Sequence, residues 1–301
     1  MISETAQRQP LLSILMPAYN FPEGIERAIE SMSSILQSNE IELVVLDDSS
    51  DIEQAKKIER LTEKYHTANY RRNVPPLGAA KNWNALLKKA RGVYCLILHH
   101  DEYFESPSII LELLQQLRKS NEPDCVVLTC ALAVAGKPLR KHMPNLPSRW
   151  VLNHWPTYLI RRNMIGSPSV FVLRRSLYEA YDERLRWYLD VELYVRILNR
   201  SKLRITILPT IGIISDQSFS GSITKNIVNE LPAIRRQEAA LLKASGTFAK
   251  NWGWIVDPGP ASMGLRAIET TAWCVFRVGW SVSQNILEFN SFRRVLKHFR
   301  F

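Results

Sequence analysis

The chain has 301 residues, 46% of them hydrophobic, which is enough to bury the core of one large domain or two small ones. Lysine and arginine outnumber aspartate and glutamate by 39 to 29, a formal net charge of +10. This charge favours anionic partners, and phosphates, nucleic acid and an acidic membrane face remain open as alternatives. No apolar window reaches the roughly 20 residues of a membrane-spanning helix. The nearest, residues 272–282, contains Arg277, so we expect no bilayer span.

The chain begins with MISETAQRQP, which lacks the basic flank and apolar run of a secretory signal. We therefore expect a cytoplasmic protein. The cysteines show no CxxC spacing, which argues against a zinc ribbon. We interpret them as buried small hydrophobic residues in a reducing compartment. They are Cys95, Cys125, Cys130 and Cys274.

Strand and helix patterns alternate along the first 135 residues. Continuous apolar runs, typical of strands buried on both faces, are followed by segments with helical spacing. The predicted strands are 11–16, 41–46, 69–73, 93–98 and 125–134. The first predicted helix begins at Pro22, the second ends near Tyr65 and the third ends at Gly92. The fourth begins at Pro107, with Ser106 as its N-cap. This order predicts an α/β fold with a mostly parallel, open sheet and helices on both faces.

The second half of the chain is less regular. Residues 146–163 mix prolines and aromatic residues, and later segments resume the strand and helix patterns. The predicted elements are strands at 168–173 and 203–208, a helix at 190–200, a loop at 216–224 and a helix from about 228 to 245. There is no internal repeat and no low-complexity linker, so we expect the second half to pack on the first.

Polar segments follow three of the predicted buried strands, namely PAYN, DDSSD and HHDE. In open parallel sheets, ligands bind beyond the carboxyl ends of the strands, so we expect these segments to share one site. If the strand continues, His99 and Asp101 share a face and His100 does not. Asp101 is suited to a hard cation such as Mg²⁺ or Mn²⁺. A solvated polar turn is the alternative, and the split histidines disfavour a three-ligand zinc site.

Four segments together resemble the family 2 glycosyltransferases of GT-A fold, in order and spacing, over roughly residues 10–225. They are LLSILMPAYN, ELVVLDDSS, GAAKNWNALLKKARGVYCLILHHDE and GSPSVFVLRRSLYEAYDERLRWYLDVELYVRIL. The resemblance implies a Rossmann-like open mixed sheet with helices on both faces in residues 1–225. Its nucleotide-binding half is about 10–135 and its acceptor-side half about 136–225. We expect residues 226–301 to form a helical C-terminal extension.

The resemblance also implies donor-binding residues. The loop after the first strand would line the base, with Tyr19 stacking on it, and Asp48 or Asp47 would contact the uracil or ribose. An acidic pair at a strand end is also a common helix cap. The matching positions for the base, the ribose and the diphosphate are Pro17, Ala18, Tyr19, Asp47, Asp48, Lys81 and Asn82. Lys81 has a simpler alternative as a solvated helical lysine.

The HHD segment stands where the family has its D-x-D metal motif. Asp101 matches the metal-binding aspartate, so the resemblance implies Mg²⁺ or Mn²⁺ as cofactor. His99 replaces the aspartate that contacts the ribose, although imidazole can bond a hydroxyl or help hold Mn²⁺. His100 lies between them and is counted with the donor-binding residues. The NVPPLG loop before Asn82 is longer than the family's Asn-x-Gly.

RLRWYLDVEL matches the acceptor-side segment, with Leu189 in place of an acidic residue and Asp190 at the position of the catalytic base. Inverting transfer needs a carboxylate that takes the proton of the acceptor hydroxyl. With an ordinary pKa of about 4, such a base acts by position. The alternative is that Asp190 only caps the helix that it opens.

These residues predict an inverting glycosyltransferase that uses a nucleotide diphosphate sugar, most simply UDP-linked. The acceptor would be a hydroxyl of a glycan or lipid-linked glycan in surface polysaccharide synthesis. The alternatives are a non-catalytic nucleotide-sugar-binding partner subunit and a nucleic-acid protein, the latter supported only by net charge. The aromatic and basic tail, including residues 273–280 and 292–301, either contacts an anionic membrane surface or forms a core helix with a solvated end.

Overall fold

The computed structural model describes residues 9–134, 137–142, 151–200, 203–216 and 229–244. The helices are α1 (Pro22–Glu30), α2 (Ile52–Thr62), α3 (Ala79–Lys89), α4 (Pro107–Leu117), α6 (Leu189–Arg200) and α8 (Leu231–Ala244). The strands are β1 (Leu12–Ala18), β2 (Ile41–Asp47), β3 (Ala68–Arg72), β4 (Tyr94–Ile97), β5 (Glu102–Phe104), β6 (Cys125–Val134), β7 (Lys137–His142), β8 (Phe171–Arg174) and β9 (Ile205–Asp216). The strands and helices expected within these ranges are present, with shifted ends, whereas most of the helical extension expected over 226–301 lies outside the described residues.

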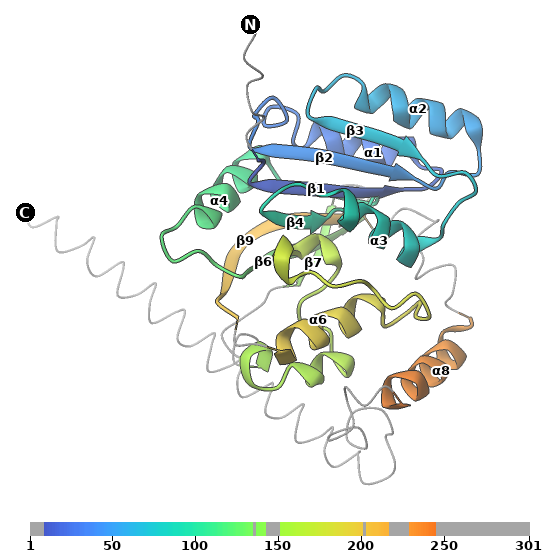
Figure 1. Ribbon diagram of the computed structural model, residues 1–301, viewed down its shortest axis with the longest axis vertical. Coiled ribbons are helices and arrows are strands. Elements are labelled where there is room, and N and C mark those ends of the chain that lie inside the picture. Colours follow the sequence, from blue (N-terminus) through green and yellow to red (C-terminus); the bar gives the residue numbers. More distant parts are fainter. Residues whose placement is uncertain (1–8, 135–136, 143–150, 201–202, 217–228, 245–301) are drawn as a thin grey trace, which may run out of the picture. The chain divides into compact units, whose positions relative to one another are not determined.

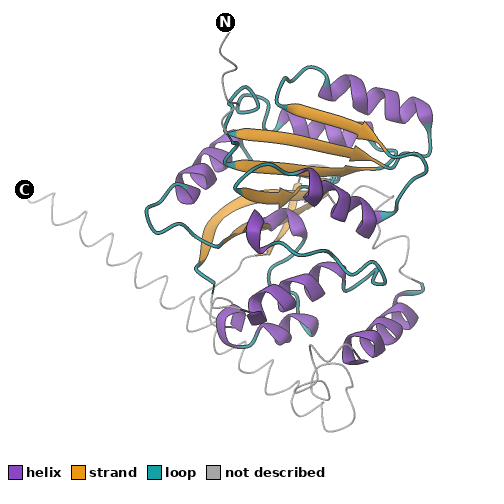
Figure 2. Cartoon of the chain, viewed as in Figure 1, coloured by secondary structure: helices purple, strands orange, loops and turns teal. Residues whose placement is uncertain are grey.

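The described strands form one nine-stranded sheet in the order β3-β2-β1-β4-β8-β6-β9-β5, with β7 paired to β6 (Figures 1 and 2). Strands β1 to β4 pair in parallel, as do β6 and β9. Strand β8 lies between β4 and β6 and is antiparallel to both, and β5 and β7 also pair antiparallel. The parallel order expected from the alternating pattern thus holds for β1 to β4, and the mixed sheet implied by the resemblance is confirmed for the described strands as a whole.

The first four strands create a switch point in the sheet. The chain passes from β1 outward to β2 and β3, and then returns to β4 on the other side of β1. Because such crossovers are right-handed, α1 and α2 cover one face and α3 the other, and Figure 1 shows α3 in front of the sheet with α1 behind it. Ligands bind in the crevice at such a switch point, beyond the carboxyl ends of the strands.

The core explains these elements. Every residue of β1, β2 and β4 is buried, as expected for strands covered on both faces. Helix α1 begins at Pro22, and α2 is capped by Asp51, whose side chain accepts hydrogen bonds from the backbone N–H groups of Glu53 and Gln54. The three cysteines in the described ranges are free and buried, as expected.

One helix end differs from expectation. Helix α3 ends at Lys89, and Ala90 already has an extended backbone, so Gly92 is not its terminator. Gly92 is instead buried against β1, where its N–H donates to the Ser13 hydroxyl at 2.8 Å. A Cβ on Gly92 would lie 2.6 Å from the backbone nitrogen of Ser13, so close approach of the chain is what requires glycine here.

The second half packs on the first through β8 and β9, which pair with β4 and β6. Helix α6 buries one face, including Tyr194, whose ring lies 4.6 Å from that of Phe171 in β8. Helix α8 lies near the start of α6 and is joined to it by the buried carboxylate of Glu238. Within the described ranges, no helix combines the length and apolar character needed to cross a bilayer. The aromatic and basic tail lies outside those ranges.

Candidate active site

A cavity of about 810 Å³ opens at the carboxyl ends of β1, β2 and β4. Its lining comes from segments far apart in the sequence: the ends of these strands, the start of α3, the segment 159–168, the start of α6, and α8. The carboxylates of Asp48, Asp101 and Asp190 all line it. The prediction that the polar strand ends share one site is confirmed.

The loop after β1 is tied to the loop after β2. Asn20 has a positive φ of 47° and accepts a hydrogen bond from the Asp51 backbone through its side chain, while its own N–H donates to the Ser49 hydroxyl. Asn tolerates this left-handed conformation better than most residues. The turn leaves Tyr19 half-exposed at the cavity, with its ring available for stacking.

Asp48 holds the loop before α3. Its carboxylate accepts 2.8 Å hydrogen bonds from the Asn73 amide and from the backbone N–H of Gly78, which has a φ of 82°. Asn82 lines the cavity, but its side chain donates to the Leu46 carbonyl at 3.0 Å and accepts from Asn73. These bonds fix the shape of the cavity wall that a nucleotide would face.

His99, Asp101 and Glu102 form a group suited to a metal ion. One ligand atom from each lies within 4.8 Å of the others. The buried Glu102 carboxylate accepts hydrogen bonds from Ser167, at 2.8 Å, and from Ser169, and it lies 3.6 Å from His99 Nδ1. Burial and the neighbouring Asp101 charge raise the pKa of Glu102, whereas burial lowers that of His99.

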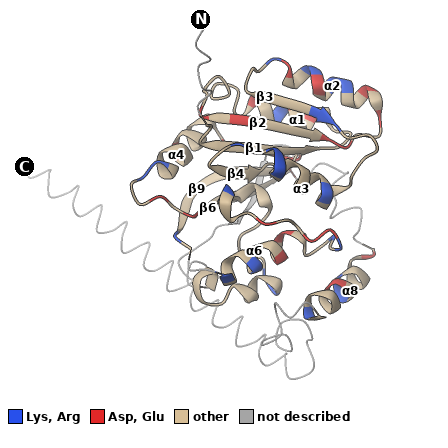
Figure 3. Ribbon diagram, in the orientation of Figure 1, with Lys and Arg blue, Asp and Glu red and all other residues tan. Residues whose placement is uncertain are grey.

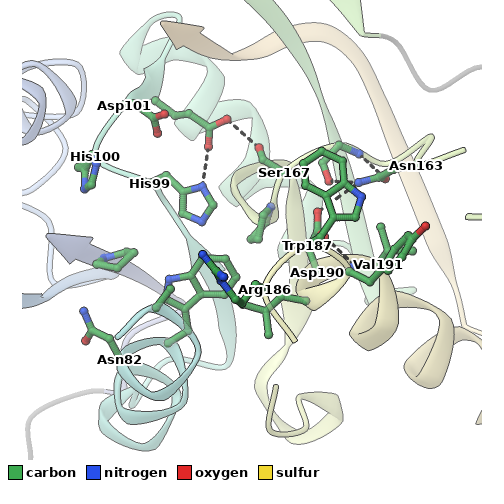
Figure 4. Close-up of a pocket in the computed structure, with 18 of the residues that line it drawn as sticks. Asn82, His99, His100, Asp101, Asn163, Ser167, Arg186, Trp187, Asp190 and Val191 are labelled. Atoms are coloured by element: carbon green, nitrogen blue, oxygen red, sulfur yellow. Dashed lines mark hydrogen bonds and ion pairs between the residues drawn. The ribbon is translucent and has the colours of Figure 1, made fainter. Parts of the chain in front are cut away.

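The geometry of this group differs from the strand alternation expected for it. Strand β4 ends at Ile97, and residues 98–101 form a turn that leads into β5. Alternation does not apply in a turn, so His100 lines the cavity together with His99 and Asp101. The alternation on which the expectation for His100 rested is therefore absent, and which of these side chains face one ligand stays a prediction. Figure 4 shows His99, His100 and Asp101 on one side of the cavity.

Asp190 lies on the opposite side of the cavity, next to Asn163 (Figure 4). It is the second residue of α6, so it does not cap a helix that begins at Leu189. Its carboxylate accepts from the Val191 N–H at 2.8 Å and from the Asn163 amide at 3.2 Å. Burial raises its pKa to about 7, the Glu102 charge adds to this, and the two hydrogen bonds oppose it. The carboxyl is thus a stronger base than the ordinary one expected from the sequence.

Two further groups hold the segment around Asp190. Asn163 accepts hydrogen bonds from the backbone N–H groups of Ile165 and Gly166 at 3.1 and 2.9 Å. The Glu238 carboxylate, on α8, accepts hydrogen bonds of 2.5 to 3.1 Å from three successive backbone N–H groups just before α6. They belong to Arg186, Trp187 and Tyr188.

Most of the predicted site residues line the cavity. They are Pro17, Ala18, Tyr19, Asp48, Asn82, His99, His100, Asp101 and Asp190. Asp47 does not line it, because this last residue of β2 is buried and accepts hydrogen bonds from Ser49 and from the Tyr70 hydroxyl. Lys81 is exposed on α3 and also lies outside the lining.

Sequence reasoning missed several lining residues. Glu102 belongs to the HHDE segment, and its position directly after Asp101 was the sequence signal that could have identified it as a site residue. Asn163, Arg186 and Arg235 had none, because they belong to irregular or ordinary amphipathic segments and reach the cavity only through the tertiary fold.

The family model for glycosyl transferase family 2 matches residues 13–181. An uncharacterized protein of Mycobacterium tuberculosis is 28% identical over 210 residues, which are 64% of this chain and 63% of that protein. An uncharacterized glycosyltransferase of Methanocaldococcus jannaschii is 23% identical over 196 residues, 63% of this chain and 65% of that protein. The chain thus spans less than two thirds of the length of these relatives.

Among solved structures, S. aureus TarS 1–349 in complex with UDP-GlcNAc has a TM-score of 0.54 and 18% identity, over 71% of this chain and 60% of TarS. The UDP complex of the same protein has a TM-score of 0.53 and 18% identity, over 68% of this chain and 60% of TarS. At this identity the likeness establishes the fold, which is GT-A, as expected from the sequence.

Proposed function

Because the chain belongs to glycosyl transferase family 2, we propose that it is an inverting glycosyltransferase that uses a nucleotide diphosphate sugar. The donor is most simply UDP-linked, and the acceptor is a hydroxyl of a glycan or lipid-linked glycan in surface polysaccharide synthesis. One observation carries the proposal. A single cavity at the carboxyl edge of the sheet is lined by Asp48, Asp101 and Asp190, and Figure 4 shows Asp190 on the side opposite Asp101.

The donor is proposed to bind at the switch point between β1 and β4. Pro17, Ala18 and the half-exposed ring of Tyr19 line the position of the base. Asp48 is the acidic residue for the ribose or base, since Asp47 is turned away into the core. His99 and His100 line the next part of the cavity, where imidazole nitrogens can bond hydroxyl groups of the ribose or the sugar.

The residues present fit a divalent cation of the Mg²⁺ or Mn²⁺ type. Asp101 and Glu102 offer the carboxylate oxygens that these ions prefer, and His99 offers an imidazole. His99 Nδ1 lies 3.6 Å from the Glu102 carboxylate, and its buried Nε2 has no hydrogen-bond partner among the described residues. Hydrogen bonds from Ser167 and Ser169 orient the Glu102 carboxylate. A bound cation would neutralise charge on the leaving diphosphate.

Asp190 is proposed as the general base. The acceptor hydroxyl oxygen forms a bond to the anomeric carbon, while the bond from that carbon to the diphosphate breaks and its electron pair stays with the diphosphate. The hydroxyl proton passes to the Asp190 carboxylate. A pKa of about 7 suits a base that works near neutral pH. The Val191 and Asn163 hydrogen bonds keep the carboxylate oriented for this transfer.

Screening nucleotide sugars by thermal shift, with and without Mn²⁺, tests this function. A UDP-sugar, or another single donor, should raise the melting temperature and should do so more strongly with Mn²⁺. No shift with any nucleotide sugar contradicts the proposal. A shift without turnover in the presence of any acceptor would favour a non-catalytic nucleotide-sugar-binding subunit. We also propose that the protein is cytoplasmic and peripheral on the inner face of the membrane, because its net charge of +10 favours an anionic lipid surface.

A further inference from the structure

The charges that line the cavity are divided between its two sides. Asp48, Asp101 and Glu102 come from the strand ends of the first half of the chain. The segments around Asp190 contribute three arginines, Arg161, Arg186 and Arg235, and Asp190 is their one acidic residue among the described lining. The carboxylate side is suited to a cation and a diphosphate. The arginine side is suited to a second anion.

We propose that Arg186 and Arg235 form a phosphate-binding subsite for the acceptor, next to the proposed base Asp190. This inference rests on the proposed function and names the class of its acceptor, a glycan or carrier that bears a phosphate group. Arginine forks match phosphate geometry with paired hydrogen bonds. The positive charges of two arginines balance the negative charge of one phosphate group.

Arg235 is an exposed residue of α8 that lies next to the segment before α6. Its Nε donates to the Tyr188 hydroxyl at 3.4 Å, and Tyr188 lies two residues before Asp190. Among the described residues this is the hydrogen bond that its guanidinium makes, so the rest of the fork is left for a ligand. Figure 3 shows basic residues on α8 at this side of the molecule.

Arg186 has a weak protein partner. Its Nη1 lies 3.6 Å from Glu230, and both side chains are more than half exposed, at 58% and 66%. Exposed ion pairs of this kind contribute about 0–1 kcal/mol, so a phosphate can replace Glu230. Figure 4 labels Arg186 among the residues that line the cavity, together with Trp187 and Asp190.

The arginines are not the counter-charge of Asp190. The main influences on the pKa of Asp190 are burial, backbone N–H groups, Glu102 and Asn163. An arginine in contact with this carboxylate would lower its pKa instead of leaving it at about 7.

The turn that carries Arg186 is built rather than loose. Glu238 is 3% exposed and takes the backbone N–H groups of Arg186, Trp187 and Tyr188. Arg235 is one helical turn before Glu238 on α8, so the same helix that anchors the turn also presents the second arginine. Arg186 and Arg235 thus come from the two segments that Glu238 joins, and both line the cavity.

The test measures binding of glucose 1-phosphate to the full chain in the presence of saturating UDP and Mn²⁺, which occupy the donor side. Glucose and glucuronate are the comparison probes. The variant is the double substitution Arg186→Gln and Arg235→Gln. The matched control is Arg184→Gln with Arg236→Gln, which removes the same charge from neighbouring exposed arginines that do not line the cavity. UDP affinity is measured for each protein.

We expect glucose 1-phosphate to bind the wild-type protein and the control, and to bind the Arg186 and Arg235 variant about tenfold more weakly. Absence of glucose 1-phosphate binding to the wild-type protein overturns the subsite, as does equal loss in both double variants. If glucuronate binds as tightly, the acceptor class is wrong. If UDP affinity falls instead, the arginines serve the donor diphosphate. A wild-type protein that binds no UDP contradicts the proposed function, and phosphate binding is then still measurable without UDP.

Discussion

The Glu238 carboxylate accepts a 2.9 Å hydrogen bond from the backbone N–H of Tyr188, two residues before Asp190. Glu238 thus acts on the proposed base through the backbone, as a positioning residue. One of its partners, the N–H of the buried Tyr188, would otherwise be unsatisfied. The catalytic geometry therefore depends on α8, which follows the region matched by the family model.

Glu238→Ala should lower kcat about 10- to 100-fold with little change in the KM for the donor, because the base is displaced while the donor side is intact. Glu238→Gln keeps one oxygen acceptor and should recover part of kcat. Gln237→Ala, at the exposed neighbouring position on α8, is the control and should leave kcat unchanged. Equal losses of kcat and melting temperature in all three variants would indicate only a folding role.

The activity should depend on the ionisation of Asp190. Since its pKa is raised to about 7 and the carboxylate must be charged to accept a proton, kcat/KM should rise with pH and level off above that value. Asn163→Ala removes a hydrogen bond that favours the charged form, so the acid limb should move to higher pH. A limb that stays in place in a folded Asn163→Ala protein would show that another group controls it.

The same carboxylate should destabilise the fold at neutral pH. Its folded-state pKa lies above the unfolded value of about 3.9, so the cost of the charged form is absent below pH 4, grows between pH 4 and 7, and is complete above pH 7. The stability of Asp190→Asn relative to wild type should rise over this range, on the order of 1–2 kcal/mol for a partly exposed side chain. Urea unfolding at several pH values measures this, and a difference that is constant with pH would count against the raised pKa.

Removal of a proposed metal ligand should weaken Mn²⁺ binding. Asp101→Asn and Glu102→Gln each remove one carboxylate from the group, and we expect at least about a tenfold loss of Mn²⁺ affinity by titration with electron paramagnetic resonance. Glu105→Gln, an exposed neighbour, is the control and should bind as wild type. If Glu102→Gln binds Mn²⁺ with unchanged affinity, Glu102 is not a ligand and the site consists of Asp101 and other groups.

The sequence was sufficient to place the strand ends, because buried parallel strands have long apolar runs and their polar ends meet at one edge. It indicated Asp190 only through the resemblance to family 2 glycosyltransferases, and the role of Asp190 as base stays a prediction. It could not choose between Asp47 and Asp48. The structure separates them, since β2 continues through Asp47 and alternation then turns one side chain into the core and the next toward the cavity.

The remaining differences come from long-range contacts. Strand β8 lies between β4 and β6 in the sheet, although it follows the end of β6 by about 40 residues in the sequence. No local pattern predicts an inserted antiparallel strand. Glu238 lies on an ordinary amphipathic helix, where a glutamate usually faces solvent. Its burial and its three N–H partners depend on how α8 packs against the start of α6.

The most direct test of the account compares Asp190→Asn with wild type, using the nucleotide sugar that binds, with Mn²⁺ and an acceptor mixture, and measuring nucleotide diphosphate release together with donor affinity. We predict that release falls at least about 100-fold while donor affinity stays within about twofold of wild type. Release that persists in Asp190→Asn, or that is lost together with donor binding, would contradict a base that faces the donor across the cavity.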